Sequence, residues 1–137
     1  MYRIFTGFIM YLSLFAIASG AALGAILRWL LGTCLNSLHS YLPYGTLVAN
    51  WTGAYLIGLS SGLFTHFVNI APEWWLFVIT GFLGGLTTFS TFSLESVQLL
   101  QSQRYAAAIA HMLLHTGGSL LLTILGLLSV HWWPKIA

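Results

Sequence analysis

Apolar residues run along most of this chain in long stretches that charged residues interrupt only six times. The charge-free stretches cover 4–27, 29–72, 74–94 and 105–134. A membrane-spanning helix needs about 20 predominantly apolar residues, and each stretch is long enough to hold one. A cluster of loop-forming residues between Asn36 and Gly45 divides the second stretch between two helices. The pattern predicts four helices, at about 8–34, 45–69, 74–100 and 105–131.

The composition places these helices in a membrane. The chain has 137 residues, of which 58% are hydrophobic and only 4% are charged. A soluble domain carries about 25% charged residues, so this chain cannot build a water-facing surface. A net charge of +2 gives no reason to expect a nucleic-acid partner. We therefore expect an all-α membrane protein in contact with lipid, with one transmembrane domain over residues 1–137.

The charges do not choose an orientation for the four predicted helices. Both termini would lie on one side of the membrane with Arg3 and Lys135, and the opposite side would carry Arg28 and Arg104. With two positive residues on each side, the positive-inside rule does not favour either orientation. Either so few charges make the count uninformative, or the chain inserts both ways and pairs with an inverted copy. Inverted repeats within one chain are common in transporters, but no internal repeat is visible here.

The third predicted helix contains residues that suit a helix poorly. Gly84-Gly85 and Thr87-Thr88 fall near the centre of the span at 74–100. A broken helix exposes backbone polar groups, which is tolerated only where protein or a water-lined path satisfies them. Broken helices at the membrane midplane are common ion sites. We favour a break here over the alternative, a face of small residues used for helix packing.

Two phenylalanines follow this predicted break. Phe89 and Phe92 are three residues apart and share a helix face, with Ser90 and Thr91 between them. The edge of an aromatic ring is electropositive and can attract an anion without a formal charge. The alternative is that both rings contact lipid or the protein core. Glu95 follows one turn later, and a charge inside a membrane helix is a functional candidate.

The fourth predicted helix carries polar residues at four-residue spacing. This stripe consists of His111, His115, Ser119 and Thr123. Thr46 and Asn50 have the same spacing on the second helix. An amide or imidazole is costly in lipid, so Asn50 and His115 should face the protein interior. The two histidines match a metal-binding spacing, but the sequence offers no third ligand, which argues against a zinc enzyme.

These groups suit ion passage better than catalysis. Hydroxyl, amide and imidazole donors with little formal charge can replace the water around a small anion and still release it. No nucleophile–base–acid set, phosphate-binding loop or cofactor motif is present, so we do not expect an enzyme. The candidate ion-pathway residues are Asn50, Phe89, Phe92, Thr46, Ser90, Thr91, His115, Ser119, Thr123 and Glu95. Arg28 has a vestibule or structural role, or only snorkels. Gly20 with Gly24, and Gly58 with Gly62, predict close helix packing.

Three motifs together carry a family resemblance. They are Gly-Ala-Ile-Leu-Arg at 24–28, Gly-Thr-Leu-Val-Ala-Asn-Trp-Thr-Gly at 45–53 and Gly-Gly-Leu-Thr-Thr-Phe-Ser-Thr-Phe-Ser at 84–93. Over residues 15–130 the chain resembles the CrcB/Fluc family of fluoride channels. The resemblance implies a fluoride-selective channel for passive export, located in the bacterial inner membrane. It also implies an inverted homodimer of four-helix subunits with two fluoride pores.

The resemblance also implies roles for individual residues. Asn50 corresponds to the family's pore amide, and Phe89 with Phe92 to its phenylalanine pair. Its polar track on the fourth helix corresponds to His115, Ser119 and Thr123. Gly84 and Thr87 mark a structural sodium ion at the dimer centre, held by backbone carbonyls. Two departures are about ten additional residues before the first helix and a histidine at position 115, where other members carry different polar residues.

Two other classes of membrane protein fit part of the pattern. A small dual-topology multidrug exporter also has four helices, but it needs a carboxylate in its first helix to exchange protons for cationic drugs. The first predicted helix contains no Asp or Glu. A non-transporting assembly subunit would not need a polar stripe inside the fourth helix.

Overall fold

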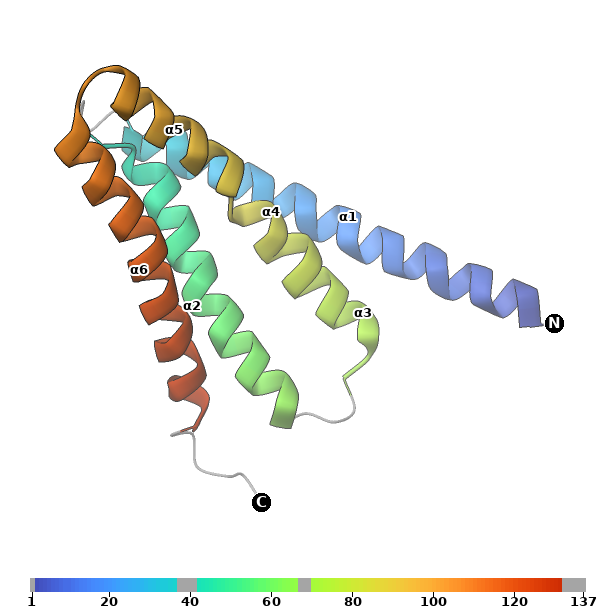
Figure 1. Cartoon of the computed structure of the whole chain (residues 1–137). Helices are drawn as coiled ribbons and strands as arrows, with labels where there is room; N and C mark the ends of the chain where they lie inside the picture. Colours follow the sequence, from blue (N-terminus) through green and yellow to red (C-terminus); the bar gives the residue numbers. More distant parts are fainter. Residues whose placement is uncertain (1, 37–41, 67–69, 132–137) are drawn as a thin grey trace.

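The computed structural model describes residues 2–36, 42–66 and 70–131, and all of the regular structure within these residues is helical (Figure 1). The elements are α1 (Tyr2–Leu35), α2 (Tyr44–His66), α3 (Pro72–Trp75), a π-helical segment (Leu76–Leu83), α4 (Gly84–Leu86), α5 (Phe89–Gln101) and α6 (Tyr105–His131). The last residues of the second predicted helix, 67–69, lie outside the described residues, as do Lys135 and the side chain of Arg3. The first helix begins at Tyr2 rather than near residue 8, because the apolar stretch already starts at residue 4.

Within the described residues, three helical stretches are long and apolar enough to cross a membrane. They are Ile9–Leu35, Pro72–Gln101 and Tyr105–His131. Pro72–Gln101, which corresponds to the third predicted helix, is called the third stretch below. The remaining long helix, α2, has 23 residues and carries polar side chains that include Thr46 and Asn50. It packs chiefly against α6 and also against α1 and the third stretch, and the Thr46 side chain is buried. The helix α2 therefore meets protein on several sides, although Thr52 and Thr65 on it are exposed.

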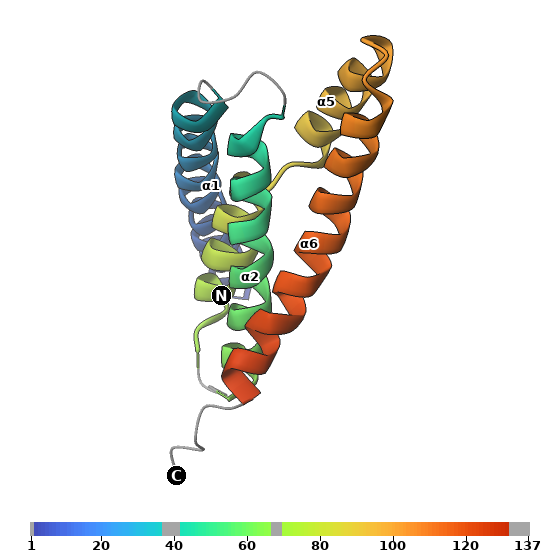
Figure 2. The same ribbon diagram turned by 90° about the vertical axis from the view of Figure 1, so that its left-hand side faces the viewer.

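The predicted break in the third helix is present. Thr87 and Thr88 both have extended backbone conformations, with φ/ψ of −81°/154° and −150°/125°. The Thr88 hydroxyl oxygen then caps α5 by accepting the backbone N–H of Thr91 at 3.1 Å. These two extended residues carry the chain from the side of α1 and α2 to the side of α6 (Figure 2).

Glycines allow the helices to approach closely, as their spacing predicts. A Cβ atom on Gly24 would collide with the carbonyl oxygen of Phe82 in the π-helical segment. A Cβ atom on Gly58 would collide with the carbonyl oxygen of Thr123 in α6. Gly20 makes the same kind of backbone approach to the π-helical segment. The structure thus joins α1 to the third stretch, and α2 to α6, by backbone contact.

A small core holds the break in place. Ala49 of α2 packs against Leu83 and Leu86, and at most 2% of each of these three residues is exposed. Leu86 ends α4 immediately before the extended residues, and Leu83 ends the π-helical segment three residues earlier. The packing of α2 against these leucines fixes where the helix stops and which residues of α2 face the break.

Candidate functional site

Two open grooves flank the break at Thr87 and Thr88. The central groove has a volume of about 540 Å³ and lies between α2, the third stretch and α6. Its polar lining consists of Asn50, Thr87, Thr88, His115, Thr116, Ser119 and Thr123. The α1–α5 groove has a volume of about 460 Å³ and is lined by Arg28, Thr46, Thr91 and Glu95, among others. Thr88 lines both grooves, so the break is the wall that they share.

Asn50 connects α2 to the broken helix through both ends of its amide. Its Oδ1 atom accepts the backbone N–H of Thr88 at 2.8 Å, which fixes the orientation of the amide. Its Nδ2 atom donates to the Thr88 carbonyl at 3.1 Å and lies 3.1 Å from Nδ1 of His115. An amide nitrogen carries two hydrogens, and these two contacts use both. The Asn50 amide therefore acts as a holding group for Thr88 and His115.

The contact with Asn50 also decides the proton position on His115. An amide nitrogen can only donate, so Nδ1 of His115 must accept and the neutral ring carries its proton on Nε2. This Nε2 atom is buried and has no hydrogen-bond partner among the described residues. Because His115 lines the central groove, its Nε2–H is a buried donor without a protein acceptor.

The hydroxyls of Ser119 and Thr123 follow His115 along α6. They differ in whether the hydroxyl hydrogen already has an acceptor within the protein. The Thr123 hydroxyl donates to the carbonyl oxygens of Ala54, at 3.0 Å, and Ser119, at 2.9 Å. Its hydrogen is therefore already used within the protein. The Ser119 hydroxyl has no hydrogen-bond partner within the part of the chain that the structure describes, and it lines the same groove. Ser119 and His115 thus supply the donors that remain for a guest in the central groove.

The two phenylalanines form part of the wall of the central groove but differ in environment. Phe89 is 76% exposed, whereas Phe92 is 8% exposed, and their ring centroids are 5.4 Å apart. The Phe92 ring lies 4.9 Å from the His115 ring and 5.4 Å from the His111 ring. Phe92 is therefore fixed by packing on α6, while Phe89 faces open space within a single chain.

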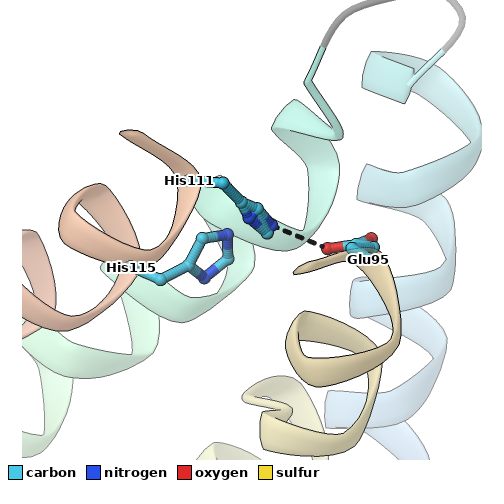
Figure 3. Close-up of side chains that lie close together, drawn as sticks. All are labelled: Glu95, His111 and His115. Atoms are coloured by element: carbon cyan, nitrogen blue, oxygen red, sulfur yellow. Dashed lines mark ion pairs between the residues drawn. The ribbon is translucent and has the colours of Figure 1, made fainter. Parts of the chain in front are cut away.

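Glu95 lies between α2 and α6 at the edge of the α1–α5 groove. Its Oε1 atom accepts the Thr46 hydroxyl at 2.6 Å, and its Oε2 atom lies 3.3 Å from Nε2 of His111 (Figure 3). The His111 and His115 rings stack with their centroids 4.3 Å apart. The expectation that these two histidines lack a third potential ligand was wrong, because folding brings the Glu95 carboxylate beside them.

The break leaves specific backbone carbonyls without their helical donors. In a continuous helix the N–H of Thr88 would bond to the Gly84 carbonyl, and the N–H of Thr91 to the Thr87 carbonyl. Both donors are used elsewhere, by Asn50 Oδ1 and by the Thr88 hydroxyl. The Gly85 carbonyl accepts Nε of Arg28 at 3.0 Å, so this arginine bonds to the broken helix. Gly84 and Thr87, whose carbonyls are among those that lost their helical donors, are the residues that the sequence resemblance assigns to sodium.

The structure distributes the sequence-predicted residues over the two grooves. The central groove receives Asn50, Gly84, Thr87, Phe89, Phe92, His115, Ser119 and Thr123. The α1–α5 groove receives Arg28, Thr46, Thr91 and Glu95. Ser90 is exposed, contacts the Thr88 hydroxyl at 3.1 Å and lines neither groove.

Sequence reasoning missed the central position of Thr88 and the contact of His111 with Glu95. The spacing of Thr88 and Thr91 fits a helix cap and could have revealed the first. The second depends on how α5 and α6 are placed against each other, which no local pattern records.

Known proteins match this chain over most of its length. The family model for "CrcB-like protein, Camphor Resistance (CrcB)" matches residues 15–127. A Chromohalobacter salexigens protein named "Fluoride-specific ion channel FluC" is 58% identical over 118 residues, which cover 86% of this chain and 89% of that protein. A Pseudomonas aeruginosa protein of the same name is 57% identical over 123 residues, covering 90% of this chain and 97% of that protein. From its motifs, its helical fold and these matches, the chain belongs to the CrcB family.

Proposed function

We propose that this protein is a fluoride-selective ion channel that lets fluoride leave the cell passively. Similar proteins that cover nearly the same length carry the name "Fluoride-specific ion channel FluC". The observation that carries the proposal is the pair His115 and Ser119, one helical turn apart in the lining of the central groove, with the Nε2–H of His115 buried and without a hydrogen-bond partner among the described residues. Fluoride is small and strongly hydrated, so it needs replacement donors of this kind.

The proposed pathway uses donors without fixed positive charge. His115 and Ser119 would donate to fluoride, and Asn50 would hold His115 in the tautomer that carries its hydrogen on Nε2. Hydrogen bonds are stronger in a low-dielectric channel than in water, which offsets the loss of hydration. The ring edges of Phe89 and Phe92 add a weak attraction for the anion and narrow the groove. Because no lysine or arginine lines the central groove among the described residues, the ion can also leave.

A structural sodium ion at the break fits the donor chemistry. Sodium is a hard cation that prefers oxygen ligands, and the carbonyls of Gly84 and Thr87 have lost their helical donors. These two backbone oxygens would hold the ion, which would supply positive charge that stabilises the bend. No side chain is required as a ligand, so the site depends on the backbone path rather than on residue identity.

An inverted homodimer would complete the central groove. Phe89 is largely exposed although it lines this groove, so one chain forms only part of the wall. The equal numbers of positive residues on the two predicted sides would allow both insertions. In such a dimer α2 is the fourth spanning helix, with Thr46 buried and Asn50 bonded to the broken helix and to His115. The assembly would lie in the inner membrane of a bacterium, with its outer apolar faces in lipid.

Cysteine labelling tests the inverted arrangement. The native cysteine, Cys34, is exposed and must be replaced by serine first. Single cysteines at Tyr2 and at Lys135 should each be labelled from both faces of the membrane by an impermeant reagent. Labelling from one face only would contradict the inverted dimer and would leave the channel proposal standing.

Fluoride efflux from liposomes tests the function itself. Purified protein should release trapped fluoride and retain trapped chloride, and proton-driven uptake of a cationic dye should be absent. Dye uptake without fluoride efflux would instead support a multidrug exporter. That alternative is disfavoured because the residues of α1 include no Asp or Glu.

A further inference from the structure

Glu95, His111 and His115 form a compact cluster whose polar atoms are largely unpartnered. One potential ligand atom from each residue lies within 4.8 Å of the others, and both histidines are buried (Figure 3). Apart from the 3.3 Å contact between Glu95 Oε2 and His111 Nε2, no partner among the described residues reaches these two atoms, and none reaches Nδ1 of His111 or Nε2 of His115. Buried polar atoms with so few partners are rare in folded proteins, and a bound ion is one recognised explanation.

The cluster is built on rigid elements. His111 and His115 are one turn apart on α6, so their rings lie on the same helix face, and their planes differ by only 12°. Glu95 projects from α5, and its other oxygen is held by the hydroxyl of Thr46 on α2. Three helices therefore fix the positions of the three donor groups before any ligand arrives.

We propose that this cluster is a binding site for a divalent transition-metal ion such as zinc. Two imidazole nitrogens and one carboxylate oxygen are a donor set typical of zinc, nickel, copper and cobalt. Three protein ligands leave at least one coordination position open to water or an anion. The site is distinct from the sodium site proposed at Gly84 and Thr87, which offers only oxygen ligands.

The two grooves provide access to this buried cluster. His115 lines the central groove and Glu95 lines the α1–α5 groove, so the cluster separates the two. A hydrated cation can reach the carboxylate from the α1–α5 groove without crossing the apolar core. The carboxylate of Glu95 attracts a cation locally, against the charge of Arg28 in the same groove.

Metal binding conflicts with the present hydrogen bond between Asn50 and His115. To bind a metal through Nε2, the neutral His115 ring must first shift its proton from Nε2 to Nδ1, by exchange with water and without net release of a proton. That proton would then face the Asn50 amide hydrogens, because Asn50 Oδ1 is held by the Thr88 N–H. The metal must therefore separate His115 from Asn50, and binding removes the Nε2–H donor of His115.

Bound metal should inhibit fluoride passage, a consequence that rests on the proposed function. A divalent ion beside one carboxylate leaves a net positive charge of about one at the cluster, with an open coordination position. Such a centre would hold fluoride in place instead of releasing it. The cluster would thus make the channel sensitive to excess transition metal.

Metal binding is measured first, without any transport. Purified protein without an affinity tag is titrated with cobalt(II), whose visible absorption reports a four- or five-coordinate site. We expect one cobalt per chain, displaced by zinc. Glu95→Gln and His111→Gln should each weaken binding by about tenfold or more, since each removes a ligand. The matched control is His131→Asn, which removes an exposed histidine from the same helix and should bind cobalt as the wild type does.

Zinc-edge X-ray absorption of the wild-type protein keeps the test independent of how the variants fold. We expect two imidazoles in the first coordination shell together with oxygen ligands. A shell with fewer than two imidazoles, no cobalt binding at all, or binding unchanged in both ligand variants would overturn the proposal.

Fluoride efflux with and without zinc then separates this inference from the proposed function. Zinc should slow efflux through the wild type and through His131→Asn, each compared with its own zinc-free rate, but not through His111→Gln. Efflux without any metal binding would refute the metal site alone. Metal binding without any efflux would refute the channel and leave the site intact. Binding that leaves efflux unchanged would overturn the placement of the cluster on the pathway.

Discussion

Asn50 and Thr88 form a reciprocal pair in which one side-chain amide replaces the backbone partners that the broken helix lost. Asn50 Oδ1 accepts the Thr88 N–H at 2.8 Å, and Asn50 Nδ2 donates to the Thr88 carbonyl at 3.1 Å. The break at the centre of the third stretch is thus stabilised from α2, a helix 38 residues earlier in the chain. The same amide reaches His115, so one residue holds both the break and the proposed donor.

Replacement of Asn50 by alanine should therefore impair folding and flux together. It leaves the Thr88 N–H and carbonyl without their partners, and a buried unsatisfied group costs about 1–3 kcal/mol of unfolding free energy. Thermal unfolding in detergent, followed by size-exclusion chromatography, measures the stability, and liposome efflux measures the function. An Asn50→Ala protein as stable as the wild type would mean that water satisfies the broken backbone.

The two phenylalanines should respond differently to the same substitution. Phe92→Ile should lower both stability and fluoride flux, because Phe92 is buried and packs on both histidine rings. Phe89→Ile should lower flux by about five- to tenfold, the equivalent of one aromatic contact of about 1 kcal/mol, and leave chain stability unchanged. Each variant is checked by thermal unfolding and assayed for efflux. If both variants fold and pass fluoride at the wild-type rate, the two rings serve only in packing.

The glycine contacts predict a clear difference between two glycine-to-alanine changes. Gly24→Ala should destabilise the protein by about 1–3 kcal/mol, because the new methyl group meets the Phe82 carbonyl and the backbones must separate. Gly117→Ala is the matched control, since a Cβ atom there meets nothing within 4 Å. Thermal unfolding of both variants in the same detergent provides the comparison. Equal changes in stability for the two variants would show that α1 and the π-helical segment have room to move apart.

Sodium dependence should survive changes to the side chain at the proposed sodium site. Gly84→Ala keeps the carbonyl, and its Cβ atom would have only the Ile79 carbonyl within 4 Å, at 3.8 Å. We expect near-normal fluoride efflux from this variant in sodium. Exchange of sodium for a large organic cation should lower efflux from the wild type and the variant alike. If fluoride efflux does not depend on sodium in either protein, the proposed structural sodium ion is contradicted.

Local sequence patterns predicted the features of this fold that arise within single helices. The weak helix formers at 84–88 predicted the break, and the apolar stretches predicted the long helices. The spacing of Gly20 and Gly24 predicted close packing, because small residues recur on one helix face. In each case a short segment contains the whole physical cause.

The contacts between helices could not be predicted in the same way. Glu95 meets Thr46 and His111 only because α5 is displaced by two extended residues and then packs on α6. Helix periodicity shows which residues share a helix face. It does not show how far that helix is shifted along, or rotated against, a neighbouring helix. The π-helical segment packs extensively on α1, and no local pattern in the sequence predicted its geometry.

Thr88 lies in the wall of both grooves, so this one residue must suit two different environments. Any residue at this place must suit an aromatic-lined cavity on one side and a carboxylate-bearing cavity on the other. It must also keep a backbone shape that Asn50 can hold. Because the two grooves share this residue, a substitution at Thr88 that changes one groove also changes the other. At this position neither groove can be altered alone.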